Sequence, residues 1–290
     1  MDKILVTGVS GFIGSNLANH LLKDEKNFIY GLDNFSSSTM SNLYPLLKNE
    51  RFEFIEHDLT NEITLEADYI YHLAGNGDLG HYYNNKYDFI LNNIEITKNI
   101  VKFSQMQGAR LVLLTQYLDY QDHNKKLHKY FDMLKLIENL VLELIENSKI
   151  NAVFARIDEV YGENLLKSDK RFIPRIIMDI LNGKNIELNF EEAFYYTYIQ
   201  DIVLNLEKLM KTYTDKPIVD LINDNLYLNS DIAKLIITYT KSNSKVILNS
   251  AVQYTPKYSP NKNYYDFSCD TTVLDGILKT VNYFRLMYFS

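Results

Sequence analysis

Cysteine is almost absent from this sequence, and the lysines and arginines are not clustered into a basic block. Cys269 is the single cysteine among 290 residues, so the chain can form neither an internal disulfide nor a cysteine metal cluster. This cysteine usage predicts a cytoplasmic protein. Acidic residues outnumber basic ones by 37 to 30, for a net charge of −7, which leaves no electrostatic footprint for nucleic acid or for an anionic membrane.

Long apolar runs are missing as well. No stretch approaches the roughly 20 residues that a membrane-spanning helix needs. The first three residues lead directly into a strand pattern, so we expect no targeting segment. The six histidines show no paired spacing on one helix, which argues against a metal site. A hydrophobic content of 46% is sufficient for one large domain, or for one domain with a smaller lobe.

A glycine-rich turn, TGVSGFIG at residues 7–14, follows an apolar strand pattern and precedes a helical one. Gly8 permits a tight turn, Gly11 lets backbone amides approach a phosphate, and Gly14 lets the helix pack close to the strand. The helix N-terminus adds the positive end of its dipole. The turn therefore predicts a binding site for the pyrophosphate of a dinucleotide, with contacts from Gly8, Ser10, Gly11, Phe12, Ile13 and Gly14.

An acidic residue follows at the distance that such a site requires. Asp33 lies about 20 residues beyond the last glycine and ends the apolar segment 28–32. A carboxylate there accepts hydrogen bonds from the adenosine ribose and repels a 2′-phosphate, which favours NAD over NADP. The alternative is that the glycines serve only a tight strand-to-helix turn.

Short apolar runs alternate with long amphipathic stretches, as in a parallel sheet with crossover helices. We expect strands at residues 3–7, 28–32, 52–56, 69–73, 110–115 and 151–156, with helices near 13–23, 40–49, 88–107 and 128–147. The fold class is therefore α/β, a Rossmann-type doubly wound parallel sheet. Beyond it we expect short strands at 218–222 and 245–248 and helices near 173–182, 202–212, 231–240 and 271–284.

This second set predicts a smaller C-terminal α/β lobe. The dinucleotide-binding domain is assigned to residues 1–160, with further sheet elements from about 195–225, and the substrate lobe to most of 161–290. Ser230-Asp231 is a candidate helix cap, and Pro174 fits a first helical turn.

Further segments match a known pattern: DNFS at 33–36, Asp58-Leu59, HLAG at 72–75, Asn93 with Thr97, Arg156 through VYG at 160–162, and YIQD at 198–201. With the glycine turn they resemble TGxxGxxG, DNxS/T, HLAA, NxxGT, RxxNVYG and YVDD of the extended short-chain dehydrogenase/reductases. Within that family the resemblance is to the NAD-dependent nucleotide-sugar epimerases and dehydratases. It covers most of the chain.

The resemblance implies bound NAD, hydride transfer on a small-molecule substrate that is a nucleotide-linked sugar, and a homodimer. It assigns cofactor contacts to Asp33, Asn34, Asp58, Leu59, Leu73, Ala74 and Asn93, and substrate contacts to Arg156, Arg175 and Tyr161. The dimer would form through the helices at 88–107 and 128–147, with apolar surface from Ile90, Leu91, Ile94 and Leu136.

Several of these residues have an equally simple structural interpretation. His72 is typical of a hydrogen-bonded core histidine, and Asn93 can bond backbone at a junction of sheet and helix. Tyr161 and Tyr198 are two of 23 tyrosines, for which packing is the commoner role. Asp58 can be a turn residue.

The proton-transfer residues depart from the family pattern. Redox members place a lysine four residues after a tyrosine on one helical face, where its charge lowers the pKa of the phenol. Here Tyr130 is followed by Leu134, whereas Lys135 is four residues after Phe131. No register keeps both groups.

Two further positions also differ. The family's serine or threonine corresponds to Gln116, with Thr115 one residue earlier, if 119–121 is the short stretch that closes the fifth strand. Gln116 can donate a hydrogen bond but cannot relay a proton as a hydroxyl does. The arginine-aspartate pair expected before YIQD is Phe194-Tyr195.

Two function classes follow. In the first, the protein is an NAD-dependent enzyme in which Tyr130, with Gln116 and Thr115, works in a rearranged site. Compensation would come from Lys135 reaching back, or from His81 in the polar loop 76–82. In the second, the chain is a catalytically inactive NAD-binding module, a sensor or a partner subunit.

Overall fold

The chain folds into two compact units. The computed structural model describes residues 1–75, 82, 84–116, 128–147, 149–212, 216–250, 253–254 and 269–289. Unit 1 consists of residues 1–156 and 206–219, and unit 2 of residues 157–205 and 220–290. His81 and the stretch 119–121 lie outside the described residues.

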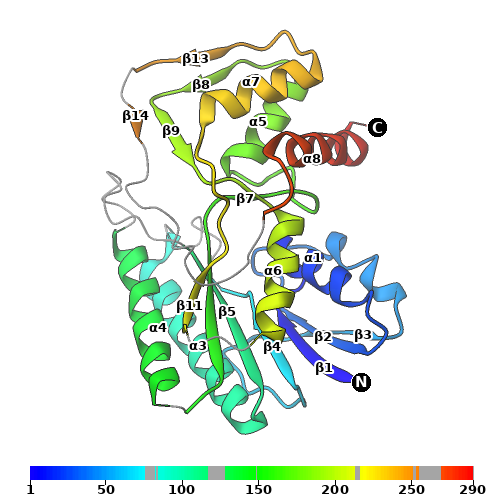
Figure 1. Ribbon diagram of the computed structural model, residues 1–290, viewed down its shortest axis with the longest axis vertical. Helices are drawn as coiled ribbons and strands as arrows, with labels where there is room; N and C mark the ends of the chain where they lie inside the picture. The colour runs from blue at the N-terminus through cyan, green and yellow to red at the C-terminus, as the bar shows by residue number, and fades with distance from the viewer. Residues whose placement is uncertain are drawn as a thin grey trace. The chain divides into compact units, whose positions relative to one another are not determined.

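A seven-stranded sheet forms the centre of unit 1, in the order β11-β6-β5-β4-β1-β2-β3 (Figure 1). The strands are β1 (Asp2–Thr7), β2 (Asn27–Asp33), β3 (Phe52–Glu56), β4 (Tyr69–His72), β5 (Arg110–Gln116), β6 (Ala152–Ile157) and β11 (Ile218–Asp220). β1 pairs in parallel with both β2 and β4. The chain therefore reverses its winding direction between β1 and β4, the switch point at which such sheets bind ligands. The predicted α/β class is confirmed.

Helices cover both faces of this sheet. α3 (Lys86–Gln107) and α4 (His128–Glu146) lie on one side in Figure 1, and α1 (Phe12–Leu21) lies on the other with the C-terminal part of α6 (Ile199–Lys211). The main core forms where α3 and α4 meet the sheet, around Leu5, Ile70, Ile100, Phe103, Leu111, Val141 and Phe154. Burial of their apolar surface is the principal stabilising term of the unit.

The prediction of one helix over residues 40–49 is wrong. The segment forms two short 3₁₀ turns, η1 (Met40–Asn42) and η2 (Leu46–Lys48), with Pro45 between them. Proline has no backbone N–H to donate, and its ring clashes with the carbonyl four residues earlier, so a continuous α-helix cannot pass through this position.

The described part of unit 2 combines helices with short groups of paired strands, and it also holds the N-terminal part of α6. The helices are α5 (Phe172–Leu181), α7 (Asn229–Thr240) and α8 (Val273–Tyr288). The pairs are β7 (Val160–Tyr161) with β10 (Thr197–Tyr198), β13 (Val246–Leu248) with β8 (Ile186–Leu188), and β9 (Glu191–Phe194) with β12 (Tyr227–Leu228) and β14 (Gln253–Tyr254). Pro174 lies in the first turn of α5, as predicted.

The predicted cap of α7 is wrong. The helix begins at Asn229, so Ser230 and Asp231 lie within its first turn. The amide of Ser230 instead donates to the Glu191 carboxylate at 3.0 Å, so a side chain from β9 satisfies one of the amides at the helix N-terminus. Long-range caps of this kind leave no local sequence signal.

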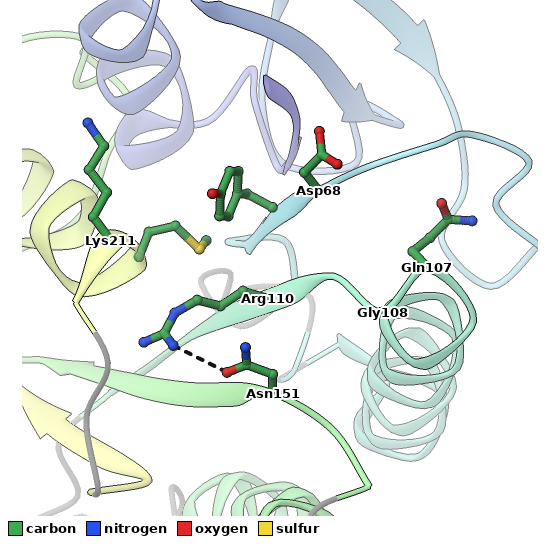
Figure 2. Close-up of a pocket in the computed structure, with 8 residues that line it drawn as sticks. Asp68, Gln107, Gly108, Arg110, Asn151 and Lys211 are labelled. Atoms are coloured by element: carbon green, nitrogen blue, oxygen red, sulfur yellow. Dashed lines mark hydrogen bonds between the residues drawn. The ribbon is translucent and has the colours of Figure 1, made fainter. Parts of the chain in front are cut away.

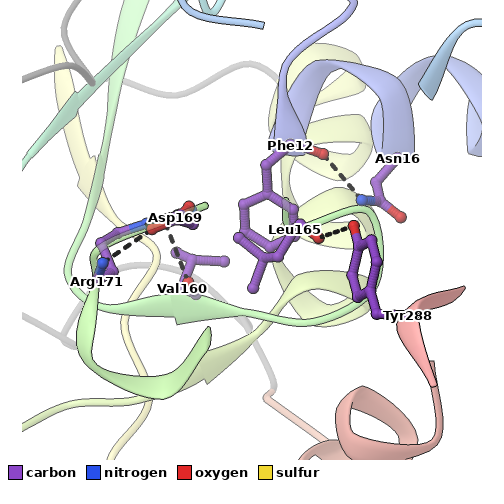
Figure 3. Close-up of polar contacts among 7 residues, drawn as sticks. All are labelled: Phe12, Asn16, Val160, Leu165, Asp169, Arg171 and Tyr288. Atoms are coloured by element: carbon purple, nitrogen blue, oxygen red, sulfur yellow. Dashed lines mark hydrogen bonds and ion pairs between the residues drawn. The ribbon is translucent and has the colours of Figure 1, made fainter. Parts of the chain in front are cut away.

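Polar contacts hold the loop between β7 and α5 (Figure 3). Arg171 donates to Asp169, with Nη2 at 2.7 Å from Oδ2, and to the carbonyl of Val160 at 3.3 Å. The hydroxyl of Tyr288, at the end of α8, donates to the carbonyl of Leu165 at 3.2 Å. Arg171 is thus engaged within its own unit.

Candidate cofactor and active site

The glycine turn lies at the switch point of the sheet, and it leaves no room for a side chain at Gly8 or at Gly14. Gly8 has φ +70°, a conformation that favours glycine, and a Cβ there would lie 2.9 Å from the amide nitrogen of Ala74. A Cβ on Gly14 would lie 2.2 Å from the carbonyl oxygen of Gly8. α1 begins directly after Gly11, and Asn16 donates to the carbonyl of Phe12 at 2.9 Å (Figure 3). The N-terminal amides of α1 are therefore held against the end of β1, where an anion would bind.

Asp33 ends β2 and is oriented by the protein. One carboxylate oxygen accepts from the amide of Ser10 at 3.0 Å, and the other accepts from the amide of Phe35 at 2.9 Å and from the hydroxyl of Ser38 at 3.2 Å. A carboxylate oxygen has two lone pairs, so the oxygen that accepts from Ser10 retains one for a ribose hydroxyl. These bonds fix the carboxylate beside the glycine turn, as the predicted role requires.

Replacing Asp33 by asparagine should weaken NAD binding by roughly ten- to hundredfold, because hydrogen bonds to a charged acceptor contribute about 1.5–3 kcal/mol. The discrimination against NADP should fall in the same variant, since the 2′-phosphate no longer meets a negative charge. Calorimetric titration with both cofactors measures the two effects. An unchanged ratio of the two affinities would remove Asp33 from the site.

The predicted adenosine-end residues follow β3. Asp58 accepts from the amide and the hydroxyl of Thr60 at 2.9 and 2.8 Å, and chiefly the amide bond lowers its pKa. The Asp58 side chain thus forms a local turn, which is the alternative role considered for it, and it remains exposed to solvent. Leu59 is buried, and its carbonyl accepts from Asn99 at 2.9 Å.

At the end of β4, the structure favours a core role for His72. The ring is buried, its Nδ1 lies 2.9 Å from the hydroxyl of Thr7, and burial lowers its pKa to about 4. His72 is therefore neutral at pH 7 and unsuited to proton transfer there. The same Thr7 hydroxyl accepts from the amides of Leu73 and Ala74, at 3.2 and 3.3 Å.

Asn93 approaches this strand end from α3. Its side-chain nitrogen donates to the carbonyl of Phe89 at 2.8 Å, so the backbone contact foreseen as an alternative is present. Its oxygen faces Gly75, where φ is +116° and a Cβ would lie 2.9 Å from that oxygen. Gly75 replaces the second alanine of the HLAA pattern, and its lack of a side chain lets Asn93 reach the strand end.

Tyr130 lies in an aromatic cluster at the start of α4. The side chain is 2% exposed, and its ring centroid lies 5.5 Å from that of Tyr82, 6.2 Å from Phe89 and 5.7 Å from Phe131. Burial raises the pKa of Tyr130 above its ordinary value. Leu134, one turn on, is also buried and contributes no charge. A phenol in this setting is a poor base at neutral pH.

The remaining proposed catalytic residues are at the end of β5 and further along α4. Thr115 is buried and Gln116 partly buried at the carboxyl end of the strand. The ammonium of Lys135 lies 3.5 Å from the carboxylate of Glu138, toward the C-terminus of α4 and away from Tyr130. The side-chain direction of Lys135 is thus opposite to the one that reaching back requires.

Glu138 also engages Arg156. Nε of Arg156 donates to the Glu138 carboxylate at 3.0 Å, and the Glu138 side chain is 2% exposed. The guanidinium that the resemblance assigned to the substrate therefore joins β6 to α4. Sequence reasoning missed Glu138. Its signal was an acidic residue in a buried helical stripe, eight residues after Tyr130.

Glu138→Leu should destabilise the protein by about 3 kcal/mol, because it leaves a largely buried guanidinium without its carboxylate. The double variant Glu138→Leu/Arg156→Leu should lose much less, since apolar replacement of both partners removes the buried charge together with the carboxylate that compensates it. Urea unfolding of both proteins measures the difference. Equal losses in the single and double variants would show that packing, not charge, governs this site.

In unit 2, the structure gives Tyr161 a packing role. Tyr161 is 1% exposed, and a Cβ on Gly276 of α8 would lie 2.4 Å from its hydroxyl oxygen. The hydroxyl of Tyr198 donates to Glu163 at 2.7 Å. Arg175 is exposed, with its guanidinium 5.7 Å from the ring of Phe172. Of the three residues assigned to the substrate, Arg175 thus presents its charge at the surface.

A hollow lies at the amino-terminal ends of β4, β5 and β6, whereas the glycine turn lies at the carboxyl ends of the strands. It is lined by Asp68, Tyr69, Gln107, Gly108, Arg110, Asn151, Met210 and Lys211. Arg110 donates to Asn151 at 3.2 Å (Figure 2), and also to the carbonyls of Leu209 and Thr212 at 3.1 and 2.6 Å. The guanidinium therefore caps the C-terminus of α6.

Two findings concern other kinds of site. Among the residues that the structure describes, no three His, Cys, Asp or Glu side chains gather so as to hold a metal ion. Within the same ranges, no helix combines the length and the apolar character needed to cross a membrane.

Comparison with known proteins identifies relatives and similar structures. UDP-glucuronic acid decarboxylase 1 of Xenopus tropicalis is 26% identical over 305 residues, covering 98% of this chain and 72% of the relative. UDP-glucuronic acid decarboxylase 6 of Arabidopsis thaliana is 29% identical over 233 residues, covering 74% and 68%. The UDP-glucuronic acid 4-epimerase of Bacillus cereus, solved with NAD, superposes with a TM-score of 0.82 at 22% identity, covering 99% of both chains. The UDP-glucose 4-epimerase of Thermotoga maritima, solved with UDP-glucose, gives 0.83 at 18%, covering 98% and 99%.

These similarities agree with the motifs that the sequence carries from its first strand to the end of the sheet. The two solved structures are below 25% identical to this chain, so they show its fold alone. The family is shown by a sequence model of a protein family, which matches residues 4–223, most of the chain. The description of that family names both the cofactor and the chemistry. The predicted family and its cofactor class are thereby confirmed: the chain belongs to the NAD-dependent epimerase/dehydratase family.

Proposed function

We propose that this chain binds NAD and uses it for hydride transfer on a UDP-linked sugar, with UDP-glucuronic acid as the first substrate to test. The observation that carries the proposal is the glycine turn at the switch point, with α1 amides on one side and an oriented Asp33 on the other. The sugar is suggested by the relatives, several of which are named UDP-glucuronic acid decarboxylases.

The chemistry of this substrate gives two measurable products. Oxidation of the hydroxyl β to the sugar carboxylate yields a β-keto acid, which can lose carbon dioxide. If the carboxylate stays, returning the hydride to the other face of the ketone yields an epimer. In both routes a protein group must take the hydroxyl proton and later return one.

The test is incubation of the full chain with NAD and UDP-glucuronic acid, followed by mass spectrometry and proton NMR of the nucleotide sugars. Loss of carbon dioxide or formation of an epimer supports the proposal. An unchanged sugar, together with bound NAD, would contradict the substrate while leaving cofactor binding in place. Asp33→Asn is the matched control, since its product formation should fall in proportion to NAD affinity.

A second candidate is an NAD-binding module without turnover, a sensor or partner subunit. The raised pKa of Tyr130 and the apolar Leu134 beside it favour this alternative. NAD at 100 times its Kd should then stabilise the fold by about 2.7 kcal/mol, as any native-state ligand does, with no product from any UDP-sugar. Detection of a single product would exclude it.

We also propose a homodimer formed through α3 and α4. Leu91, Leu136 and Leu140 are 46%, 48% and 53% exposed, so both helices present apolar side chains that a partner could cover. Leu136→Lys should therefore shift the protein toward monomer in analytical ultracentrifugation. The same sedimentation coefficient for both proteins would contradict this surface. The single cysteine supports the cytoplasm as the compartment.

A further inference from the structure

Thr7 and His72 meet where the two strands beside the switch point end. Thr7 is the last residue of β1, His72 is the last residue of β4, and the two are partners in the register of this parallel pair. Both side chains are buried, and the Thr7 hydroxyl lies 2.9 Å from Nδ1 of the His72 ring. The residue after Thr7 is the first glycine of the turn, so this contact borders the cofactor turn directly.

The Thr7 hydroxyl also completes the end of β4. The strand stops at His72, and the amides of Leu73 and Ala74 donate to the Thr7 hydroxyl oxygen at 3.2 and 3.3 Å. Amides that follow the last ladder bond of a strand need another acceptor. The position of this backbone matters for the turn, because a Cβ on Gly8 would lie 2.9 Å from the Ala74 nitrogen.

The protons at the Thr7 oxygen fix the direction of its bond to His72. A threonine hydroxyl has two lone pairs and one proton to donate. The two amides occupy both lone pairs, so the oxygen cannot accept from a third donor, and its own proton must be donated to Nδ1. Nδ1 therefore carries no proton, and the neutral ring holds its proton on Nε2. Burial lowers the pKa of His72 to about 4, so the ring stays neutral at pH 7.

We propose that His72 is a positioning residue for the cofactor. By accepting the Thr7 proton, it directs both lone pairs of that hydroxyl at the amides of Leu73 and Ala74, and so fixes the end of β4 against the glycine turn. With an apolar residue at position 72, the hydroxyl proton turns toward another acceptor, and a lone pair leaves one of the two amides. The inference rests on the NAD binding of the proposed function and does not depend on the identity of the sugar.

The first test needs no cofactor. In protein labelled with ¹⁵N at histidine, the His72 resonances are assigned by their loss in His72→Asn, and the one-bond couplings of the ring nitrogens to hydrogen are recorded at pH 7. We expect a proton on Nε2 and none on Nδ1. Thr7→Val keeps the shape of the side chain and removes the hydroxyl, so it should shift the Nδ1 resonance. A proton found on Nδ1 overturns the proposal.

The second test measures NAD affinity by calorimetric titration. His72→Leu should weaken NAD binding by about two- to tenfold, the usual effect of losing one neutral hydrogen bond. His72→Asn should restore most of the affinity, because the side-chain oxygen of asparagine can replace Nδ1 as the acceptor. Thr7→Ser retains the hydroxyl and should bind NAD normally. Equal affinities in His72→Leu and the unaltered chain contradict the positioning role.

A double-mutant cycle separates positioning from packing. If His72 acts through Thr7, Thr7→Val should weaken NAD binding to a similar extent, and His72→Leu in the Thr7→Val background should add little. Additive losses overturn this inference and leave the proposed function standing, since His72 would then act independently of Thr7. If the unaltered chain binds no NAD, the proposed function fails and this inference fails with it.

Discussion

Gly14→Ala should abolish detectable NAD binding. The added Cβ would lie 2.2 Å from the carbonyl oxygen of Gly8 and 2.9 Å from its carbonyl carbon. These are backbone atoms of a turn in which Gly8 itself has no free space on the side of Ala74, so the clash cannot be relieved by rotating a side chain. The N-terminus of α1 must move away from β1, and its amides lose their alignment on the pyrophosphate.

Calorimetric titration to millimolar NAD measures the loss, and thermal unfolding reports the accompanying strain, about 1–3 kcal/mol for an overpacked contact. Gly108→Ala is the matched control. Gly108 also has a positive φ, +63°, yet no atom lies within 4 Å of its Cβ position. It should lose about 1 kcal/mol of stability and bind NAD normally. NAD affinity retained in Gly14→Ala would disprove the pyrophosphate site.

The cofactor half of this fold was readable from the sequence because its signals are local. A strand, three spaced glycines and an acid at the end of the next strand each depend on a few neighbouring residues, and the structure places Asp33 directly on the glycine turn. Pro45 was an equally local signal, although the helical pattern over 40–49 hid it.

Long-range pairing accounts for what the sequence did not reveal. The carboxylate that engages Arg156 comes from another element, as does the Glu191 cap of α7.

Leu134→Lys should restore proton transfer to Tyr130. The new ammonium would lie one helical turn from Tyr130, as neighbours four apart do. At about 4 Å and a partly shielded dielectric, this charge favours the phenolate by roughly 4 kcal/mol, or about three pH units. It acts against the burial that now raises the pKa of Tyr130.

Glu138 makes the substitution tolerable. It lies four residues beyond position 134, so the same carboxylate that accepts from Arg156 can also compensate the new ammonium. Leu134→Met keeps the volume without the charge and is the control for packing. Leu134→Lys should raise kcat at least tenfold over Leu134→Met, with the titration midpoint of Tyr130, followed by the ¹³C resonance of its labelled Cζ, lowered by one pH unit or more.

The direction of the pH dependence follows from the same shift. A phenol whose pKa lies above the working range supplies phenolate in proportion to hydroxide, so the rate of alcohol oxidation rises tenfold per pH unit without a plateau. A pKa lowered by Leu134→Lys brings the plateau to a lower pH. If the titration midpoint of Tyr130 falls while the rate stays at the level of Leu134→Met, the phenol of Tyr130 does not reach the sugar hydroxyl. The missing charge is then not the reason that Tyr130 transfers no proton.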